Sequence, residues 1–206
     1  VHQVGTSGLF AFHEALDTVL KKRDQLDFLL LTGSNGPVHS GGDLKESLVR
    51  LKESIEKKRK IEETSGSKEE IDRLFNWGEG RLEKGVMLYK KIREAARSMR
   101  IVALCGGGLR FGGSAEIPLM ADYIIGDSRS GMCFSEAMIG IIPGWGGITR
   151  VIVKAGLHNA ACMAKTANPV FASGLKEIGV YDSVVQIPFE LPKIKRAGSD
   201  TERLSH

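Results

Sequence analysis

The sequence has few of the features typical of secreted, membrane-spanning or nucleic-acid-binding proteins. Three cysteines in 206 residues are an odd number, and their spacing fits neither a disulfide framework nor a metal site. No apolar run approaches the roughly 18–20 residues that span a bilayer, and no charged-then-apolar leader is present. A net charge of +4 is too small for a nucleic-acid-binding face. We therefore expect an intracellular protein, cytoplasmic or alternatively mitochondrial, whose thiols are reduced and buried: Cys105, Cys133 and Cys162.

Apolar residues make up 42% of the chain, enough for the core of one domain. Apolar residues at helical spacing predict a helix over Leu9 to Arg23. The continuous apolar runs Phe28 to Thr32 and Ile101 to Cys105 are typical of strands buried on both faces. Tyr123 to Gly126 predicts a further strand, and Ile148 to Lys154 a helix. Strands that alternate with helices indicate an α/β fold with a largely parallel sheet.

The segment from Lys45 to Arg100 is dense in lysine, arginine and glutamate, and we interpret the charges as solvated helix faces. We expect two or three amphipathic helices within it. Ser67 is expected to cap one of them, because Glu70 follows three residues later. The apolar stripes that support these helices are Leu48, Leu51 and Ile55, and then Leu82, Val86, Tyr89 and Ile92.

Two glycine-rich turns and two carboxylates form the most informative pattern in the chain. Phe111 to Glu116 places a glycine turn just before a carboxylate, and Glu136 follows twenty residues later. A second glycine turn, Ile142 to Gly147, comes soon after Glu136. Backbone N–H groups at such turns can hold an oxyanion, and paired carboxylates can move a proton and hold a water molecule. The pattern indicates acid–base chemistry beside a thioester carbonyl.

In order and spacing, several segments of the chain resemble the crotonase superfamily, whose best-known member is enoyl-CoA hydratase. The likeness covers about residues 9 to 185 and lies in Leu30 to Glu46, Ile101 to Asp122, Phe134 to Arg150 and Gly174 to Val180. It implies the crotonase α/β architecture, a spiral of ββα units.

The resemblance also implies roles for four residues. Gly42 and Gly113 take the positions of the two oxyanion-hole N–H donors, although the family usually has alanine where Gly42 stands. Glu116 and Glu136 fall on the two catalytic glutamates of the hydratases. Isomerases of the family commonly keep only the carboxylate that matches Glu136, so the presence of both favours addition of water.

The expected ligand is an acyl-CoA thioester, with coenzyme A as part of the substrate and no metal or redox cofactor. No histidine stands at metal or triad spacing, and Ser114 has no base at a recognised spacing, which argues against a serine nucleophile. The family usually forms trimers or pairs of trimers, and we expect the same here. The residues expected to contact the substrate are Gly42, Asp43, Leu44, Lys45, Gly113 and Gly144.

The chain departs from the family pattern in three ways. The segment between Gly42 and Gly113 is longer than in typical hydratases by about one helical hairpin, so we expect a domain over 1–187 with a helical insertion at about 46–98. The family's first strands and last helices are mostly missing, which suggests a fragment with a polar tail over 188–206. Trp145 occupies a position that is often small, and it is expected to narrow the pocket.

The sequence therefore predicts hydration of a 2-enoyl-CoA thioester. Two alternatives use the same apparatus: double-bond isomerisation, and hydrolytic ring opening or C–C cleavage of a cyclic acyl-CoA. A non-catalytic acyl-CoA-binding protein is a third alternative, but binding alone needs neither glutamate.

Overall fold

The computed structural model describes residues 5–33, 44–64, 66–75 and 77–187. Within these ranges no helix is long and apolar enough to cross a membrane. The helices, 3-10 helices (η) and strands in chain order are α1 (Thr6–Lys21), η1 (Arg23–Gln25), β1 (Phe28–Thr32), α2 (Leu44–Glu63), α3 (Lys68–Phe75), α4 (Trp77–Ala95), β2 (Arg100–Cys105), β3 (Gly108–Phe111), α5 (Gly113–Glu116), η2 (Pro118–Met120), β4 (Tyr123–Asp127), β5 (Ser130–Cys133), η3 (Ser135–Ile139), α6 (Gly147–Thr166), β6 (Val170–Phe171), α7 (Ala172–Glu177) and β7 (Ser183–Val185).

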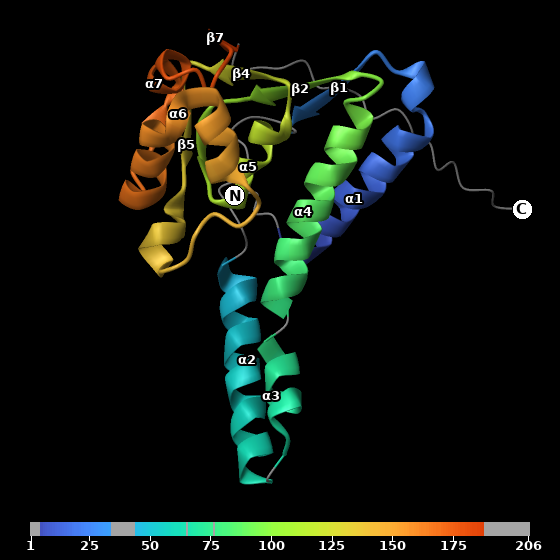
Figure 1. The fold of residues 1–206 in the computed structure, drawn as a ribbon, viewed down its shortest axis with the longest axis vertical. Helices are drawn as coiled ribbons and strands as arrows, with labels where there is room; N and C mark the ends of the chain where they lie inside the picture. Colours follow the sequence, from blue (N-terminus) through green and yellow to red (C-terminus); the bar gives the residue numbers. More distant parts are fainter. Residues whose placement is uncertain (1–4, 34–43, 65, 76, 188–206) are drawn as a thin grey trace, which may run out of the picture.

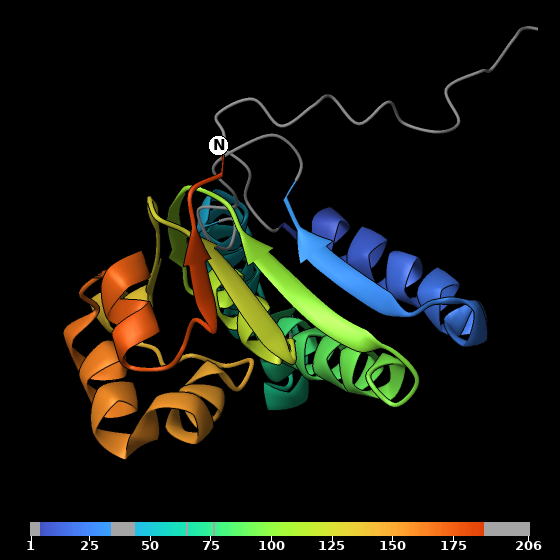
Figure 2. The same cartoon turned by 90° about the horizontal axis from the view of Figure 1, so that it is seen from above.

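The strands form two sheets. A four-stranded sheet has the order β1-β2-β4-β7, and a three-stranded sheet has the order β3-β5-β6. All pairings are parallel except that of β5 with β6, which confirms the predicted largely parallel α/β fold. Helices α1 and α4 lie side by side near β1 and β2, whereas α6 and α7 lie toward β7 (Figures 1 and 2). The core between them includes Leu88, Ile101, Ile124 and Phe134.

The predicted strand at Phe28 to Thr32 is confirmed, but the expectation that both of its faces are buried is wrong. Phe28 is 61% exposed and Leu30 is 44% exposed. The physical reason is that successive side chains of a strand point to opposite faces: Leu29 and Leu31 pack against the core, whereas Phe28 and Leu30 lie on the opposite face, which is exposed. Strand β2 lies inside the sheet, and it buries Ile101 and Cys105.

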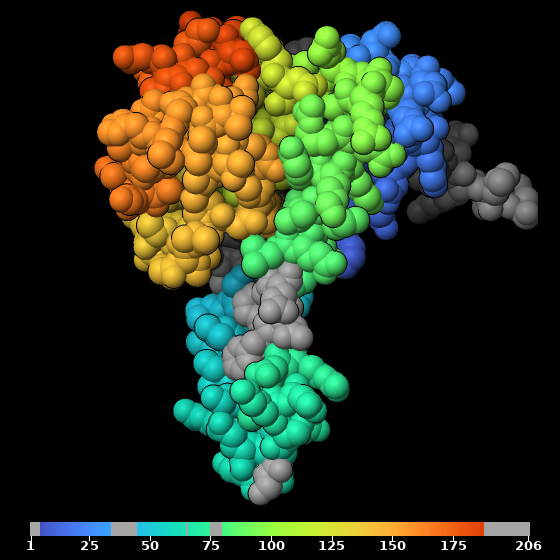
Figure 3. Space-filling model, viewed as in Figure 1, coloured from blue at the N-terminus to red at the C-terminus, as the bar shows by residue number. Residues whose placement is uncertain are grey.

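Helices α2 and α3 form a hairpin that projects away from the sheets (Figures 1 and 3). It is held by Ser54, which is buried and whose hydroxyl donates to the Leu74 carbonyl at 2.9 Å. The predicted cap at Ser67 is confirmed: the Ser67 N–H donates to the Glu70 carboxylate at 3.0 Å, and the Glu70 N–H donates to the Ser67 hydroxyl at 3.2 Å. The two contacts form a capping box that starts α3.

The charged segment forms three helices where two or three were expected, but most residues of the predicted apolar stripes do not face the core. Leu48, Leu51 and Ile55 of α2 are exposed because the hairpin stands clear of the sheets. On α4, the buried residues are Leu88, Ile92 and Ala95. From the predicted stripe only Ile92 is among them, because the packing of α1 and the sheets selects a different face of the helix. The exposed members of that stripe are Leu82, Val86 and Tyr89.

The three thiols are free, and two of them, Cys105 and Cys133, are buried as expected. Cys162 is exposed, so the expectation for it is wrong. It lies on the outer face of α6, next to His158, whereas Val151 and Ala160 of the same helix face the core.

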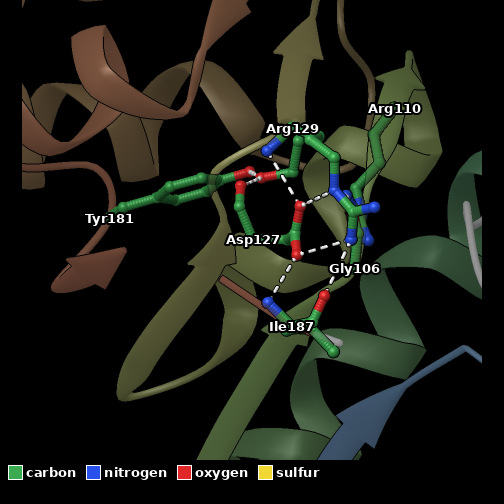
Figure 4. A network of polar contacts seen from close by, with 7 residues as sticks. Gly106, Arg110, Asp127, Arg129, Tyr181 and Ile187 are labelled. Carbon is green, nitrogen blue, oxygen red and sulfur yellow. Dashed lines mark hydrogen bonds and ion pairs between the residues drawn. The ribbon is translucent and has the colours of Figure 1, made fainter. Parts of the chain in front are cut away.

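A polar clasp around Asp127 holds the end of the described chain against the sheets (Figure 4). The fully buried carboxylate accepts hydrogen bonds from the Arg129 guanidinium at 2.8 and 3.0 Å and from the Ile187 N–H at 2.9 Å. The Ser130 hydroxyl donates to the Asp127 carbonyl at 2.7 Å and lies 3.1 Å from the Tyr181 hydroxyl. These contacts join the end of β4 to the start of β5 and to the segments on either side of β7.

Candidate active site

The first glycine turn connects β3 to α5. Gly112 has φ +54° and ψ −131°, a backbone conformation that favours glycine. Its N–H donates to the Cys133 carbonyl at 3.0 Å, which fastens the turn to β5. The helix that follows, from Gly113 to Glu116, has only four residues and passes directly into η2. A macrodipole sums over aligned peptide units, so the expected contribution of the helix dipole at Gly113 is small.

Glu116 lies at the end of this turn with its carboxylate directed at the second glycine turn. The residue is 2% exposed, and Oε1 accepts hydrogen bonds from the Trp145 N–H at 2.9 Å and the Gly147 N–H at 2.7 Å. The close approach requires glycine at 147, because a Cβ there would lie 2.7 Å from the Glu116 Cγ.

The pKa of Glu116 is raised to about 7. Burial is the largest cause, because removal from water disfavours the charged form. The Gly147 hydrogen bond opposes burial by stabilising the carboxylate, and the negative charge of Glu136 raises the pKa further. Glu136 is thus near enough to raise the pKa of Glu116.

Glu136 comes from η3, which follows β5. It is 8% exposed, and its Oε2 is buried without a hydrogen-bond partner among the described residues. A Cβ on Gly112 would lie 3.0 Å from the Glu136 Oε1, so this carboxylate lies against the first glycine turn. Burial raises its pKa. A buried carboxyl oxygen without a partner is costly, and a functional site is a common reason to retain one.

The structure therefore brings Gly113, Glu116, Glu136 and the loop at Gly144 together. Gly42 and Asp43 lie outside the described residues. Leu44 and Lys45 begin α2, and the Lys45 side chain is exposed.

Other polar groups that the sequence analysis weighed have ordinary surroundings. The His13 Nε2 lies 3.0 Å from the Lys84 carbonyl, and His39 is outside the described residues. The Ser114 hydroxyl is buried without a hydrogen-bond partner among the described residues, so no base among them accepts its proton. In the part of the chain that the structure describes, no group of three histidine, cysteine or acidic residues could hold a metal ion.

Sequence reasoning missed two backbone donors of this site, the N–H groups of Trp145 and Gly147. The Gly146-Gly147 pair signals a tight turn. Whether the N–H groups of this turn point toward Glu116 depends on how α6 packs against α5. Local sequence does not predict that packing.

A parallel-stranded crotonase fold with two buried carboxylates beside a glycine turn defines the class of protein. The sequence model of the enoyl-CoA hydratase/isomerase family matches residues 82–190, just over half of the chain. The chain belongs to this family, and the predicted membership of the crotonase superfamily is confirmed.

Solved structures with the same fold include an enoyl-CoA hydratase/isomerase from Marinobacter aquaeolei, with a TM-score of 0.68 and 16% identity. The match covers 90% of this chain and 62% of that one. An enoyl-CoA hydratase from Thermoplasma volcanium has a TM-score of 0.66 and 20% identity, over 90% and 63% of the two chains. Both lie at identities that show the fold alone.

Among curated proteins, the chain is similar to the glyoxysomal fatty acid beta-oxidation multifunctional protein MFP-a of Cucumis sativus, at 25% identity over 185 residues. It is also similar to the fatty acid oxidation complex subunit alpha of Psychrobacter cryohalolentis, at 27% identity over 166 residues. The matches cover 90% and 81% of this chain but 22% and 20% of those proteins. The chain thus spans about a fifth of the length of these relatives.

Proposed function

We propose that this protein adds water to the double bond of a 2-enoyl-CoA thioester. The observation that carries the proposal is the buried carboxylate pair: Glu116 with a pKa of about 7, and Glu136 with a raised pKa and an unpartnered oxygen. A general base works best when its pKa lies near the working pH, and a general acid must keep its proton there. Burial raises the pKa of both carboxyl groups: it brings Glu116 close to neutral pH and favours the protonated form of Glu136.

In the proposed reaction, the thioester oxygen accepts hydrogen bonds from the N–H groups of Gly113 and Gly42. These donors stabilise the enolate that forms when water adds to the double bond, and losing one such donor typically costs about 10²–10³ in rate.

Glu116 holds the water molecule and removes one of its protons as the water oxygen bonds to Cβ. The electron pair of the double bond moves to Cα and the thioester oxygen, which gives the enolate. Glu136 helps to position the water and then delivers its proton to Cα. The water thereby adds OH at Cβ, and the proton gained by Glu116 restores Glu136 through solvent exchange.

Two carboxylates support hydration over isomerisation, because moving a double bond requires one proton-transfer group and no water. The relatives named for fatty acid oxidation support an acyl-CoA substrate from that class of pathway. No metal or redox step enters the proposed mechanism, since the two carboxylates and the backbone donors carry all of its proton and charge transfers.

The test is incubation of the full-length protein with crotonyl-CoA while the absorbance of the conjugated thioester is followed. We expect the absorbance to fall and a 3-hydroxyacyl-CoA to form. Binding of acyl-CoA without turnover would exclude the hydratase and favour a binding protein. Label from heavy water at Cα without a new hydroxyl group would point to isomerisation instead. Turnover confined to a cyclic acyl-CoA would favour ring hydrolysis.

We also propose assembly into a trimer or a pair of trimers, as the family resemblance implies. A group of exposed apolar side chains after Glu136 supports this, because large exposed apolar patches commonly mark interfaces. Sedimentation velocity should show a particle larger than the monomer, and a monomer at micromolar concentration would contradict the proposal. The side chains are Met138, Ile139, Ile141 and Ile142, from 55% to 77% exposed.

A further inference from the structure

The indole ring of Trp145 is held between two backbones that approach it closely. On one side it packs against Gly113, where a Cβ would lie 2.7 Å from the ring carbon Cζ3. On the other side it packs against Gly85 of α4, where a Cβ would overlap the ring. The Nε1–H donates to the Arg81 carbonyl at 3.1 Å, and this hydrogen bond sets the orientation of the ring. Any side chain at 85 or 113 would displace the ring.

The same residue touches both halves of the proposed catalytic apparatus. Its backbone N–H donates to Glu116, and its ring covers Gly113, one of the proposed oxyanion donors. An acyl group whose thioester oxygen is bound at Gly113 must lie between this donor and the two glutamates. The carbons of that acyl group therefore run beside the indole ring.

The neighbouring residue closes the space beyond the ring. Gly144 packs so closely against Leu82 of α4 that a Cβ at 144 would overlap the leucine side chain. Helix α4 and the loop at Gly144 and Trp145 are thus in direct contact next to the ring. A longer chain could pass only if the indole left its position, with loss of the Arg81 hydrogen bond and of the packing on both glycines.

From this geometry we infer that Trp145 is a specificity-determining residue that restricts the enzyme to short acyl groups. The inference rests on the proposed function, and it adds the substrate class: thioesters with acyl chains of about crotonyl length rather than long-chain fatty acyl groups. The physical basis is steric exclusion by a ring whose two ends are packed against glycine backbones.

The test compares butyryl-CoA with decanoyl-CoA in binding and crotonyl-CoA with decenoyl-CoA in turnover. The full chain should favour the short ligand by at least about 10-fold, because a single misplaced methylene in a closed pocket already costs about that much. Trp145→Ala should remove this preference by improving long-chain binding. Trp145→Phe is the matched control: it keeps a ring but not the Nε1–H, so it should keep the preference.

Binding of saturated ligands needs no catalysis, so it separates this inference from the proposed function. A full chain that prefers butyryl-CoA but hydrates nothing would overturn the hydratase and leave the role of Trp145 intact. Equal binding of both lengths by the full chain would overturn the role of Trp145, and so would an unchanged preference in Trp145→Ala. If circular dichroism shows that Trp145→Ala does not fold, Trp145→Leu is measured instead, and the same two outcomes apply.

Discussion

At the residue scale, Glu116 is subject to opposing influences. Two backbone N–H groups stabilise its charged form, while burial and the charge of Glu136 favour its neutral form. Burial outweighs the hydrogen bonds, so the pKa rises from 4.5 to about 7. A carboxylate in this state can accept a proton near neutral pH, but its ionisation costs folding free energy.

The cost predicts that Glu116→Gln stabilises the fold at high pH. A carboxyl whose pKa is raised on folding contributes stability below its unfolded pKa, and this contribution is lost as pH rises through the folded value. Glutamine retains an oxygen acceptor but never ionises. We expect the variant to be about 3 kcal/mol more stable than the parent at pH 8, with little difference below pH 4.5. Urea denaturation across this pH range gives the measurement.

Glu83→Gln is the matched control for this experiment, because Glu83 is exposed on α4. As a substitution on an exposed helix face, it should change the free energy of unfolding by less than about 0.5 kcal/mol. If the Glu116→Gln protein is equally stable or less stable than the parent at pH 8, folding does not oppose ionisation of the Glu116 carboxyl group.

Glu136→Gln is expected to lower kcat by about 10²–10⁴, the typical contribution of a general acid or base. The substitution preserves shape and removes the proton donor, so the affinity for a saturated acyl-CoA should not change. The measurement is crotonyl-CoA turnover together with calorimetric binding of butyryl-CoA. An unchanged kcat would show that Glu136 does not deliver the proton.

The pH dependence of kcat/KM follows from the pKa of Glu116. The rate should rise as Glu116 loses its proton near pH 7, because only the charged form of this carboxyl group can take a proton from the water molecule. A profile that declines steadily from pH 5 to pH 8 would contradict this role.

At the element scale, the hairpin of α2 and α3 depends on local interactions more than the rest of the chain does. Its apolar stripe is exposed, so packing against the sheets contributes little to it. Helix α3 has eight residues, too few for stability on its own. The capping box at Ser67 and Glu70 and the Ser54 contact to α3 must therefore carry much of the order in this hairpin.

Ser67→Ala is expected to cost about 1 kcal/mol of local stability, the usual effect of removing an N-cap hydroxyl. Because the hairpin stands clear of the sheets, the effect should appear as faster hydrogen exchange of α3 amides, without change in β2 or β4. Thr18→Ala is the control: the Thr18 hydroxyl bonds back to the Glu14 carbonyl within α1 and caps nothing in α3. Unchanged α3 exchange in Ser67→Ala would contradict the role of the box.

At the scale of the whole molecule, the Asp127 clasp joins strands that are far apart in the sequence. Arg129 holds the pKa of this carboxyl well below its usual range, and the Ile187 N–H adds a bond from beyond β7. Because the pKa is depressed on folding, the stabilisation is present above the unfolded pKa and is lost as pH falls below it. The clasp thus ties the segments on either side of β7 to the end of β4 and the start of β5.

Asp127→Asn should destabilise the protein by about 2 kcal/mol at pH 7. The value lies below that of a fully buried ion pair because the Arg129 side chain is 48% exposed and its charge is partly screened by solvent. The deficit should shrink as the pH is lowered toward 3, since the parent aspartate then begins to lose its advantage. Urea denaturation measures it, and equal stability at pH 7 would contradict the clasp.

Glu136 was nominated only through its position in the family pattern, because local sequence alone indicates a loop glutamate. Local sequence was sufficient for the α/β class, the strand at Phe28 to Thr32, the Ser67 cap and the nomination of Glu116. Each depends on a short pattern: an apolar run, a serine three residues before a glutamate, or a glycine turn beside a carboxylate. Short patterns did not predict which faces of the helices and strands are buried by other elements. The exposure of Cys162 and Leu82 depends on neighbours distant in sequence.

What the sequence by itself determined is therefore the set of elements and the residue types available for chemistry, because these depend on contacts between near neighbours in the chain. The tertiary structure alone decided that the Trp145 and Gly147 N–H groups bind Glu116, and that the indole is held between Gly85 and Gly113. These contacts join residues about thirty or more positions apart. They form only when α4, α5 and α6 pack together, since close packing rather than local pattern sets which backbones meet.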